Sequence, residues 1–115
     1  MSLDPQAVER RLQQLRDLGK KAASAKKNMV MAEEGKKSIL ATLMKEYATK
    51  GFDSAVAQER EARADSRMQQ FIEAWGISVE EYESARWELE VAKIGVSAYQ
   101  TLEATRRVEM RGYGL

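Results

Sequence analysis

Apolar residues recur at helical spacing along two separate lines between residues 78 and 110. This segment has no proline and a single glycine, Gly95, so the pattern predicts a long helix. The first line consists of Val79, Tyr82, Ala85, Leu89, Ala92, Val96 and Tyr99. The second line consists of Trp87, Val91, Ile94, Ala98 and Leu102. Trp87 and Leu89 are two residues apart, about 200° around a helix, so the lines lie on nearly opposite faces and both should be covered.

Caps and glycines indicate where the first helix begins and ends. Asp4-Pro5 is typical of a helix start, because Asp accepts a free backbone N–H and Pro lacks the N–H that the first turn cannot use. Gly51 can take the left-handed conformation that ends a helix, and Asp53 or Ser54 can cap the next one. We therefore expect the chain to reverse direction at Gly51.

Two further breaks are expected before the last helix. Ser66 begins a capping-box pattern, which predicts a kink or a new start near Asp65. Gly76 is expected to end this helix, and Ser78 with Glu81 forms a second capping box. These signals predict helices at about residues 5–49, 54–75 and 79–111, with a mobile tail at residues 112–115.

The first helix carries a seam like that of a coiled coil, in which apolar residues advance by threes and fours and Lys36 is a polar interruption. Its members are Val8, Leu12, Leu15, Leu18, Ala22, Ala25, Met29, Ala32, Ile39, Leu43 and Tyr47. The small residues of the seam, with Gly19 and Gly35, indicate either a close approach of another helix or a bend. We favour the close approach.

Short connections between consecutive helices make neighbours antiparallel. The predicted fold class is therefore all-α: a long antiparallel helical hairpin or coiled coil with a short middle helix, one domain over residues 1–115, in an oligomeric helical bundle. Pairing residue 47 with about residue 57 sets a register for the hairpin. In this register, Lys20, Lys21, Lys26 and Lys27 lie opposite residues 77–84, which hold Glu80, Glu81 and Glu83.

Charge is segregated along the chain, although the formal net charge is only +1. The net charge is +5 over residues 1–50, −6 over residues 51–90 and +2 over residues 91–115. Such blocks either fold against each other or offer a basic face to a polyanion, and their near cancellation favours the first. The candidates for phosphate contact are Lys20, Lys21, Lys26 and Lys27, but no aromatic residue for base stacking occurs before Tyr47.

The composition disfavours most catalytic and metal-binding chemistry. The chain has no Cys and no His, which removes disulfides, the usual zinc sites, and Ser-His or Cys-His catalysis. The five Glu residues between positions 80 and 90 lack the His that di-metal carboxylate bundles use. We expect no enzymatic activity, no metal and no cofactor.

No segment is suited to a membrane. The longest run without a charge, residues 94–102, is far shorter than the roughly 18 residues of a membrane span, and the N-terminus is polar. We expect a cytoplasmic protein without a membrane partner.

The second line allows two interpretations. The short middle helix would bury it in a three-helix arrangement, or a second copy of the chain would cover it. Residues 54–64 are too polar to cover much apolar surface, so we favour an oligomer interface. The interface residues are Trp87, Val91, Ile94, Ala98 and Leu102, and the small Ala92, Gly95 and Ala98 would let helices cross closely.

Three segments carry a resemblance to a known group of proteins. They are Ala64-Asp65-Ser66, Tyr82-Glu83-x-Ala85-Arg86-Trp87-x-Leu89-Glu90 and Glu103-Ala104-Thr105-Arg106-Arg107-x-Glu109-Met110-Arg111. With the long charged helix before them, they resemble small uncharacterised helical coiled-coil proteins of temperate bacteriophages and prophages, over roughly residues 30–111. Because such proteins are often encoded beside recombination and single-strand annealing genes, the resemblance implies an accessory role around DNA. It implies no catalytic residue.

These observations predict a non-enzymatic interaction or structural protein that self-associates through its last helix as a homodimer or larger assembly. The resemblance implies that it is encoded by a phage. Another protein is a further candidate partner. The alternative is a DNA-binding accessory protein, or an inhibitor of a DNA-processing enzyme, that acts through the basic first helix.

Overall fold

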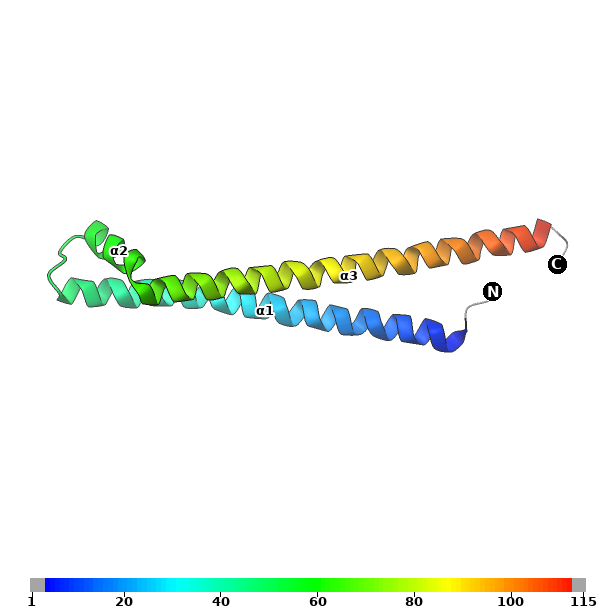
Figure 1. Ribbon diagram of the computed structural model, residues 1–115, viewed down its shortest axis with the longest axis horizontal. Helices are drawn as coiled ribbons and strands as arrows, with labels where there is room; N and C mark the ends of the chain where they lie inside the picture. Colours follow the sequence, from blue (N-terminus) through cyan, green and yellow to red (C-terminus); the bar gives the residue numbers. More distant parts are fainter. Residues whose placement is uncertain (1–3, 113–115) are drawn as a thin grey trace. The chain divides into compact units, whose positions relative to one another are not determined.

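A computed structural model describes residues 4–112 and places three helices in them: α1, Pro5–Thr49; α2, Ala55–Ala64; and α3, Ser66–Gly112 (Figure 1). No strand occurs within these described residues. The predicted all-α fold, a long helical hairpin with a short middle helix, is confirmed. Of the predicted tail, Gly112 belongs to α3 and residues 113–115 lie outside the described residues.

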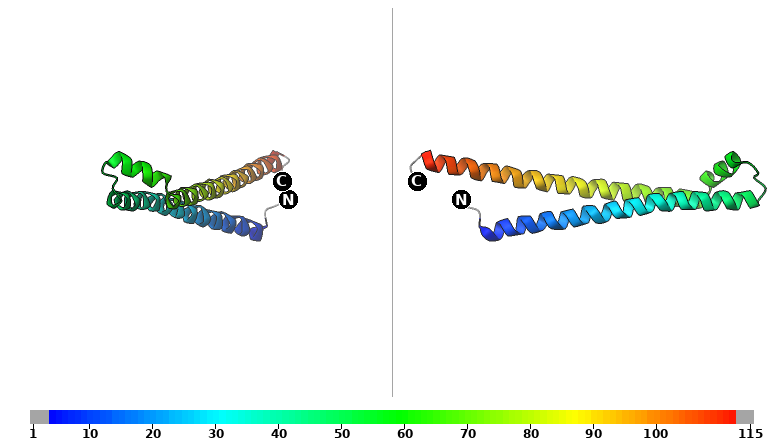
Figure 2. Two further views of the ribbon diagram at one scale, coloured as in Figure 1. Left: turned by 60° about the vertical axis from the view of Figure 1, so that its left-hand side comes forward. Right: turned by 180° about the vertical axis from the view of Figure 1, so that it is seen from behind.

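The chain divides into two compact units. The terminal unit comprises Met1–Ala22 and Ser84–Leu115, and the corner unit comprises Ala23–Glu83. In both units a segment of α1 lies beside a segment of α3 (Figure 2). The corner unit also contains α2.

The first predicted break is confirmed at Gly51. Its φ of +100° lies in the left-handed region, where a side chain would be strained. The backbone N–H of Phe52 returns to the carbonyl of Tyr47 at 3.3 Å, which satisfies one of the last carbonyls of α1. Ser54 then caps α2, because its hydroxyl accepts the N–H of Ala57 at 3.1 Å.

The second break is also confirmed, at Asp65. Its φ and ψ of −68° and 136° are extended, so α2 ends and α3 begins within one residue. The Asp65 carboxylate accepts the backbone N–H of Arg67 at 2.9 Å, which caps the first turn of α3. Asp65 therefore acts as the cap, one residue before the predicted Ser66.

The third predicted break, at Gly76 and Ser78, is wrong. α3 runs without interruption from Ser66 to Gly112, so residues 66–75 belong to it and not to the middle helix. The Ser78 hydroxyl donates to the carbonyl of Ala74 at 3.0 Å instead of capping a new helix. A glycine inside a helix costs about 1 kcal/mol relative to Ala, and the partial burial of Trp75, Val79 and Tyr82 along one face offsets that cost.

Each helix contributes one residue to the core of the corner unit. Leu43 of α1, Ala62 of α2 and Met68 of α3 are almost completely buried and pack together. Partly buried apolar side chains surround them: Ile39, Leu40, Met44, Tyr47 and Ile72. Ala62 is the buried residue of α2, which is consistent with the low apolar content of this helix.

Two contacts explain irregular positions in the α1 seam. Lys36, the polar interruption, places its Nζ 3.7 Å from the centre of the Trp75 ring, a cation–π contact. At Gly35, the Phe71 ring of α3 lies 3.5 Å from the position of a Cβ atom, an ordinary van der Waals contact. At Gly19 nothing lies within 4 Å of that position.

A polar network joins the ends of the helices around Asp65. The Tyr47 hydroxyl donates to Asp65 Oδ2 at 2.8 Å, and Arg67 Nη2 lies 3.0 Å from both Asp65 Oδ2 and Glu46 Oε2. Hydrogen bonds from Arg67 and Tyr47 hold the pKa of Asp65 well below its usual range. The same hydrogen bond to Asp65 raises the pKa of Tyr47.

This network predicts a stability that depends on pH. Because the pKa of Asp65 is lower in the folded chain than in the unfolded chain, its contribution is complete above the unfolded value of about 3.9 and is lost as pH falls below it. In urea unfolding followed by circular dichroism, wild type should lose stability more steeply between about pH 5 and pH 2 than Asp65→Asn.

Asp53→Asn is the matched control, because Asp53 is an exposed carboxylate in the connection between α1 and α2. Its pH profile should run parallel to that of wild type. Parallel profiles for wild type and Asp65→Asn would contradict a role of the network in stability.

Candidate functional site

The first line of α3 is the face that packs against α1 in the terminal unit. Ala85 is 2% exposed and Ala22 of α1 is 8% exposed, and Leu89, Ala92, Val96 and Tyr99 are partly buried. Near the end of this face, the Arg11 guanidinium lies 4.6 Å from the centre of the Tyr99 ring. The predicted role of the first line in the hairpin is therefore confirmed.

The register of the hairpin differs from the predicted one. Lys21 Nζ lies 3.2 Å from Glu88 Oε2, whereas the prediction placed Lys21 opposite residues 77–84. The prediction assumed that residues after Gly51 pair directly with the end of α1. Instead, the chain first forms α2, and in the corner unit Arg67 is the residue that meets Glu46.

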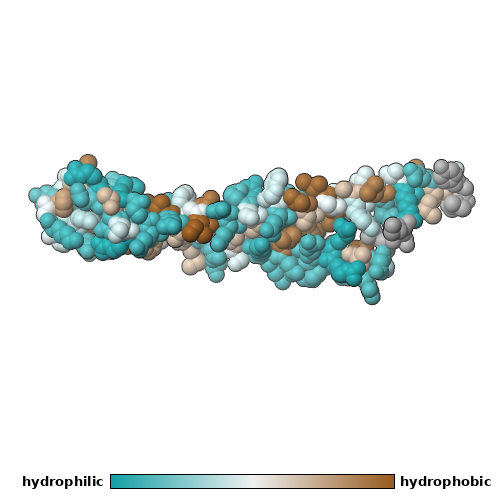
Figure 3. All heavy atoms as spheres, viewed as in Figure 1, coloured by the Kyte–Doolittle hydropathy of each residue, from teal (hydrophilic) through white to brown (hydrophobic). Residues whose placement is uncertain are grey.

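The second line of α3 is exposed. Trp87 is 70% exposed, Ile94 66%, Leu102 69% and Val91 52%, and Ala98 is also exposed. Figure 3 shows apolar side chains at the surface along this part of the chain. The alternative that the short middle helix buries this line is wrong, because α2 packs through Ala62 in the corner unit and the line stays accessible.

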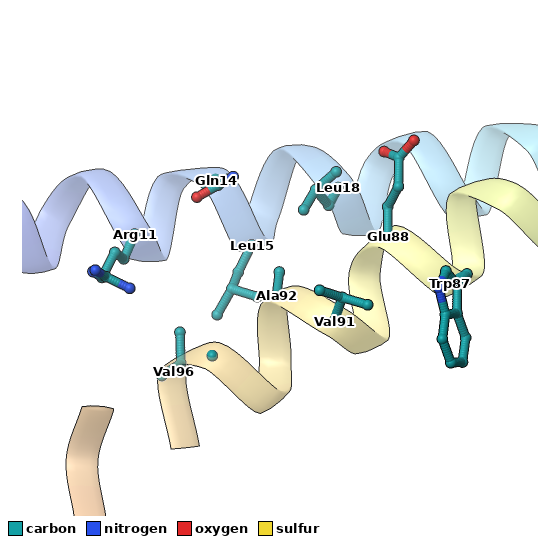
Figure 4. Close-up of a pocket in the computed structure, with 10 residues that line it drawn as sticks. Arg11, Gln14, Leu15, Leu18, Trp87, Glu88, Val91, Ala92 and Val96 are labelled. Carbon is teal, nitrogen blue, oxygen red and sulfur yellow. The ribbon is translucent and has the colours of Figure 1, made fainter. Parts of the chain in front are cut away.

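A groove runs beside the second line, between α1 and α3 of the terminal unit. Its volume is about 380 Å³. Leu15 and Leu18 of α1 line one side, and Trp87, Val91 and Gly95 of α3 line the other. In Figure 4, Leu15 extends toward Ala92 and Val96 of α3, whereas Trp87 points away from α1. The groove shares Trp87 and Val91 with the exposed line, and its lining also includes the polar side chains of Arg11, Gln14 and Glu88.

Gly95 keeps this surface open. Nothing lies within 4 Å of the position where its Cβ atom would be, so a side chain there would enter free space. Sequence reasoning identified Gly95 as small but missed the groove and its α1 side, Leu15 and Leu18. The signal was present in the small residues Ala92 and Gly95 between larger ones, and only the true register shows what lies opposite them.

The four lysines proposed for phosphate contact belong to different units. Lys20 and Lys21 are in the terminal unit, and Lys26 and Lys27 are in the corner unit. All four are exposed, and Lys21 pairs with Glu88. An exposed ion pair of this kind contributes at most about 1 kcal/mol and leaves Lys21 accessible to a competing anion.

Within residues 4–112, no group of three or more acidic side chains is arranged to hold a metal ion. Among the same residues, no helix combines the length and the apolar character that crossing a membrane requires. In this part of the chain, no polar or charged residue is buried.

Comparison of this chain with protein-family models, with curated proteins and with solved structures finds no match. The resemblance to phage proteins therefore stays a prediction.

Proposed function

We propose that this protein is a non-enzymatic interaction or structural protein that self-associates through the second line of α3. One observation carries the proposal: Trp87, Ile94 and Leu102 are each about two-thirds exposed on the same face of one helix. Large side chains aligned in this way mark interaction surfaces in soluble proteins, whereas scattered ones do not.

The energetics favour a covered face. Burying a large apolar side chain contributes roughly 1.5–3 kcal/mol, and the line holds four such residues besides Ala98. Tryptophan is enriched among the residues that dominate binding energy at interfaces. Association has to offset the loss of translational and rotational freedom. A continuous apolar line beside a groove provides more buried area than isolated residues would.

The proposal predicts that the wild-type chain is a dimer or larger assembly by light scattering at micromolar concentration. Ile94→Glu should shift the mass toward that of the monomer, 13.0 kDa, because a charge in a buried interface is costly. Circular dichroism should show that much of the helix content remains, since Ile94 is exposed in the single chain.

Met31→Glu is the matched control, because Met31 is 61% exposed and belongs to the corner unit. This variant should keep the wild-type mass. A monomeric wild type contradicts the proposal outright. If Ile94→Glu unfolds, Ile94 belongs to the core of the single chain. Ile94→Lys checks that result, because Lys at this position can pair with Glu90 along the helix.

As a second candidate function, we propose DNA binding through the basic first helix, as an accessory protein or as an inhibitor of a DNA-processing enzyme. The supporting observation is that Lys20, Lys26 and Lys27 are exposed within a segment of net charge +5, residues 1–50. Exposed lysines of this kind can neutralise phosphates and release counterions.

This second candidate predicts retention on single- or double-stranded DNA at about 50 mM salt that weakens as salt rises. Replacing Lys20, Lys26 and Lys27 by Gln should lower the slope of log affinity against log salt by up to about 0.9 for each duplex phosphate that is no longer neutralised. The control replaces Lys37, Lys45 and Lys50 by Gln, which removes the same charge from other exposed positions. Absence of binding at about 50 mM salt, or equal weakening in both triple variants, contradicts the proposed site.

A further inference from the structure

We infer that a second copy of this chain docks on the second line with its α3 antiparallel to the first, about a two-fold axis that passes between Ile94 and Gly95. The inference rests on the proposed self-association. It adds the relative direction of the two α3 helices, the residues at the two-fold axis, and the groove that receives the partner's Ile94 side chain, here called the seat. Three properties of the described residues carry it: side-chain size, the groove beside Gly95, and the distribution of charge along α3.

In an antiparallel pair, large side chains of one copy meet small residues of the other. When two copies are centred between Ile94 and Gly95, Ile94 of each copy meets Gly95 of the other, and Val91 meets Ala98. Large residues then face small ones near the centre, which is how well-packed interfaces avoid both voids and overlaps. A parallel pair in register would place Ile94 against Ile94 and Gly95 against Gly95, so that crowded layers alternate with empty ones.

The groove provides a seat for the residue that meets Gly95. It has a volume of about 380 Å³ and is lined by Leu15 and Leu18 of α1 and by Val91 of α3. Because nothing lies within 4 Å of the Cβ position of Gly95, an incoming Ile94 side chain finds open space there. Ile94 is 66% exposed in the single chain, so burying its side chain in this groove removes apolar surface from water, which is favourable.

Charge along α3 disfavours the parallel direction. Residues 80–90 contain five Glu and one Arg, a net charge of −4. A parallel pair would bring two segments of −4 together, and juxtaposed like charges weaken association. The antiparallel pair places this segment beside residues 99–109, in which two Arg and two Glu give a net charge of 0. The antiparallel pair therefore avoids the repulsion between the two acidic segments.

Disulfide formation between single cysteines tests the direction, because the natural chain has no Cys. Ser84 and Thr105 are exposed and lie on the same face as the second line, on either side of its centre. Ser84→Cys and Thr105→Cys chains of different mass are mixed in denaturant, refolded together and oxidised mildly. The antiparallel arrangement predicts that the mixed 84–105 disulfide exceeds the two like disulfides by at least several-fold.

The outcomes separate this inference from the proposed function. Predominant 84–84 and 105–105 disulfides in a protein that is dimeric by light scattering overturn the antiparallel arrangement and leave self-association intact. A wild-type chain that stays monomeric overturns both, and the face then belongs to a different protein.

Gly95→Leu tests the contact between Gly95 and the Ile94 side chain of the partner. In the single chain, Leu enters open space and has a higher helix propensity than Gly, so helix content should be maintained or increased. In the pair it fills the seat of the partner's Ile94, and the dissociation constant should rise at least tenfold by sedimentation equilibrium.

Gly76→Leu is the matched control, because Gly76 is also exposed in α3 with nothing within 4 Å of its Cβ position, and it lies in the corner unit. Equal affinity of Gly95→Leu and Gly76→Leu overturns the seat.

Discussion

The register of α3 against α1 in the corner unit depends on the contacts made at Asp65, where α2 ends and α3 begins. Asp65 caps α3, accepts the Tyr47 hydroxyl and holds Arg67, which also reaches Glu46. Beneath this polar network, Leu43, Ala62 and Met68 pack together. Because α3 starts level with this point of α1, Phe71 lies against Gly35 and the Trp75 ring lies against Lys36.

Much of the fold follows from local signals that act within a few residues. The reversal at Gly51 follows from backbone sterics, and the break at Asp65 follows from capping, so both could be predicted. The break at Gly76 was predicted from the same kind of signal and does not occur. There, the apolar face that continues through Trp75, Val79 and Tyr82 outweighs the modest cost of one glycine and the capping preference of Ser78.

The candidate surface could be predicted only in part, for a related reason. The second line follows from helical periodicity alone, and the polarity of residues 54–64 indicated that α2 would leave it uncovered. The groove depends on which α1 residues lie opposite Gly95. That depends on the register of α1 against α3 in the terminal unit, which the periodicity of either helix does not specify. Leu15 and Leu18 were therefore recognised as seam residues and not as part of a binding surface.

The groove has two walls from segments far apart in sequence, and it exists only while residues near Leu15 and Val91 remain paired. A ligand that occupies such a groove binds the paired form and not the frayed one, so it stabilises the pairing by mass action. Under the proposed self-association, the terminal unit would become more ordered as protein concentration rises. Amide hydrogen exchange near the beginning of α1 and the end of α3 would then report assembly as well as folding.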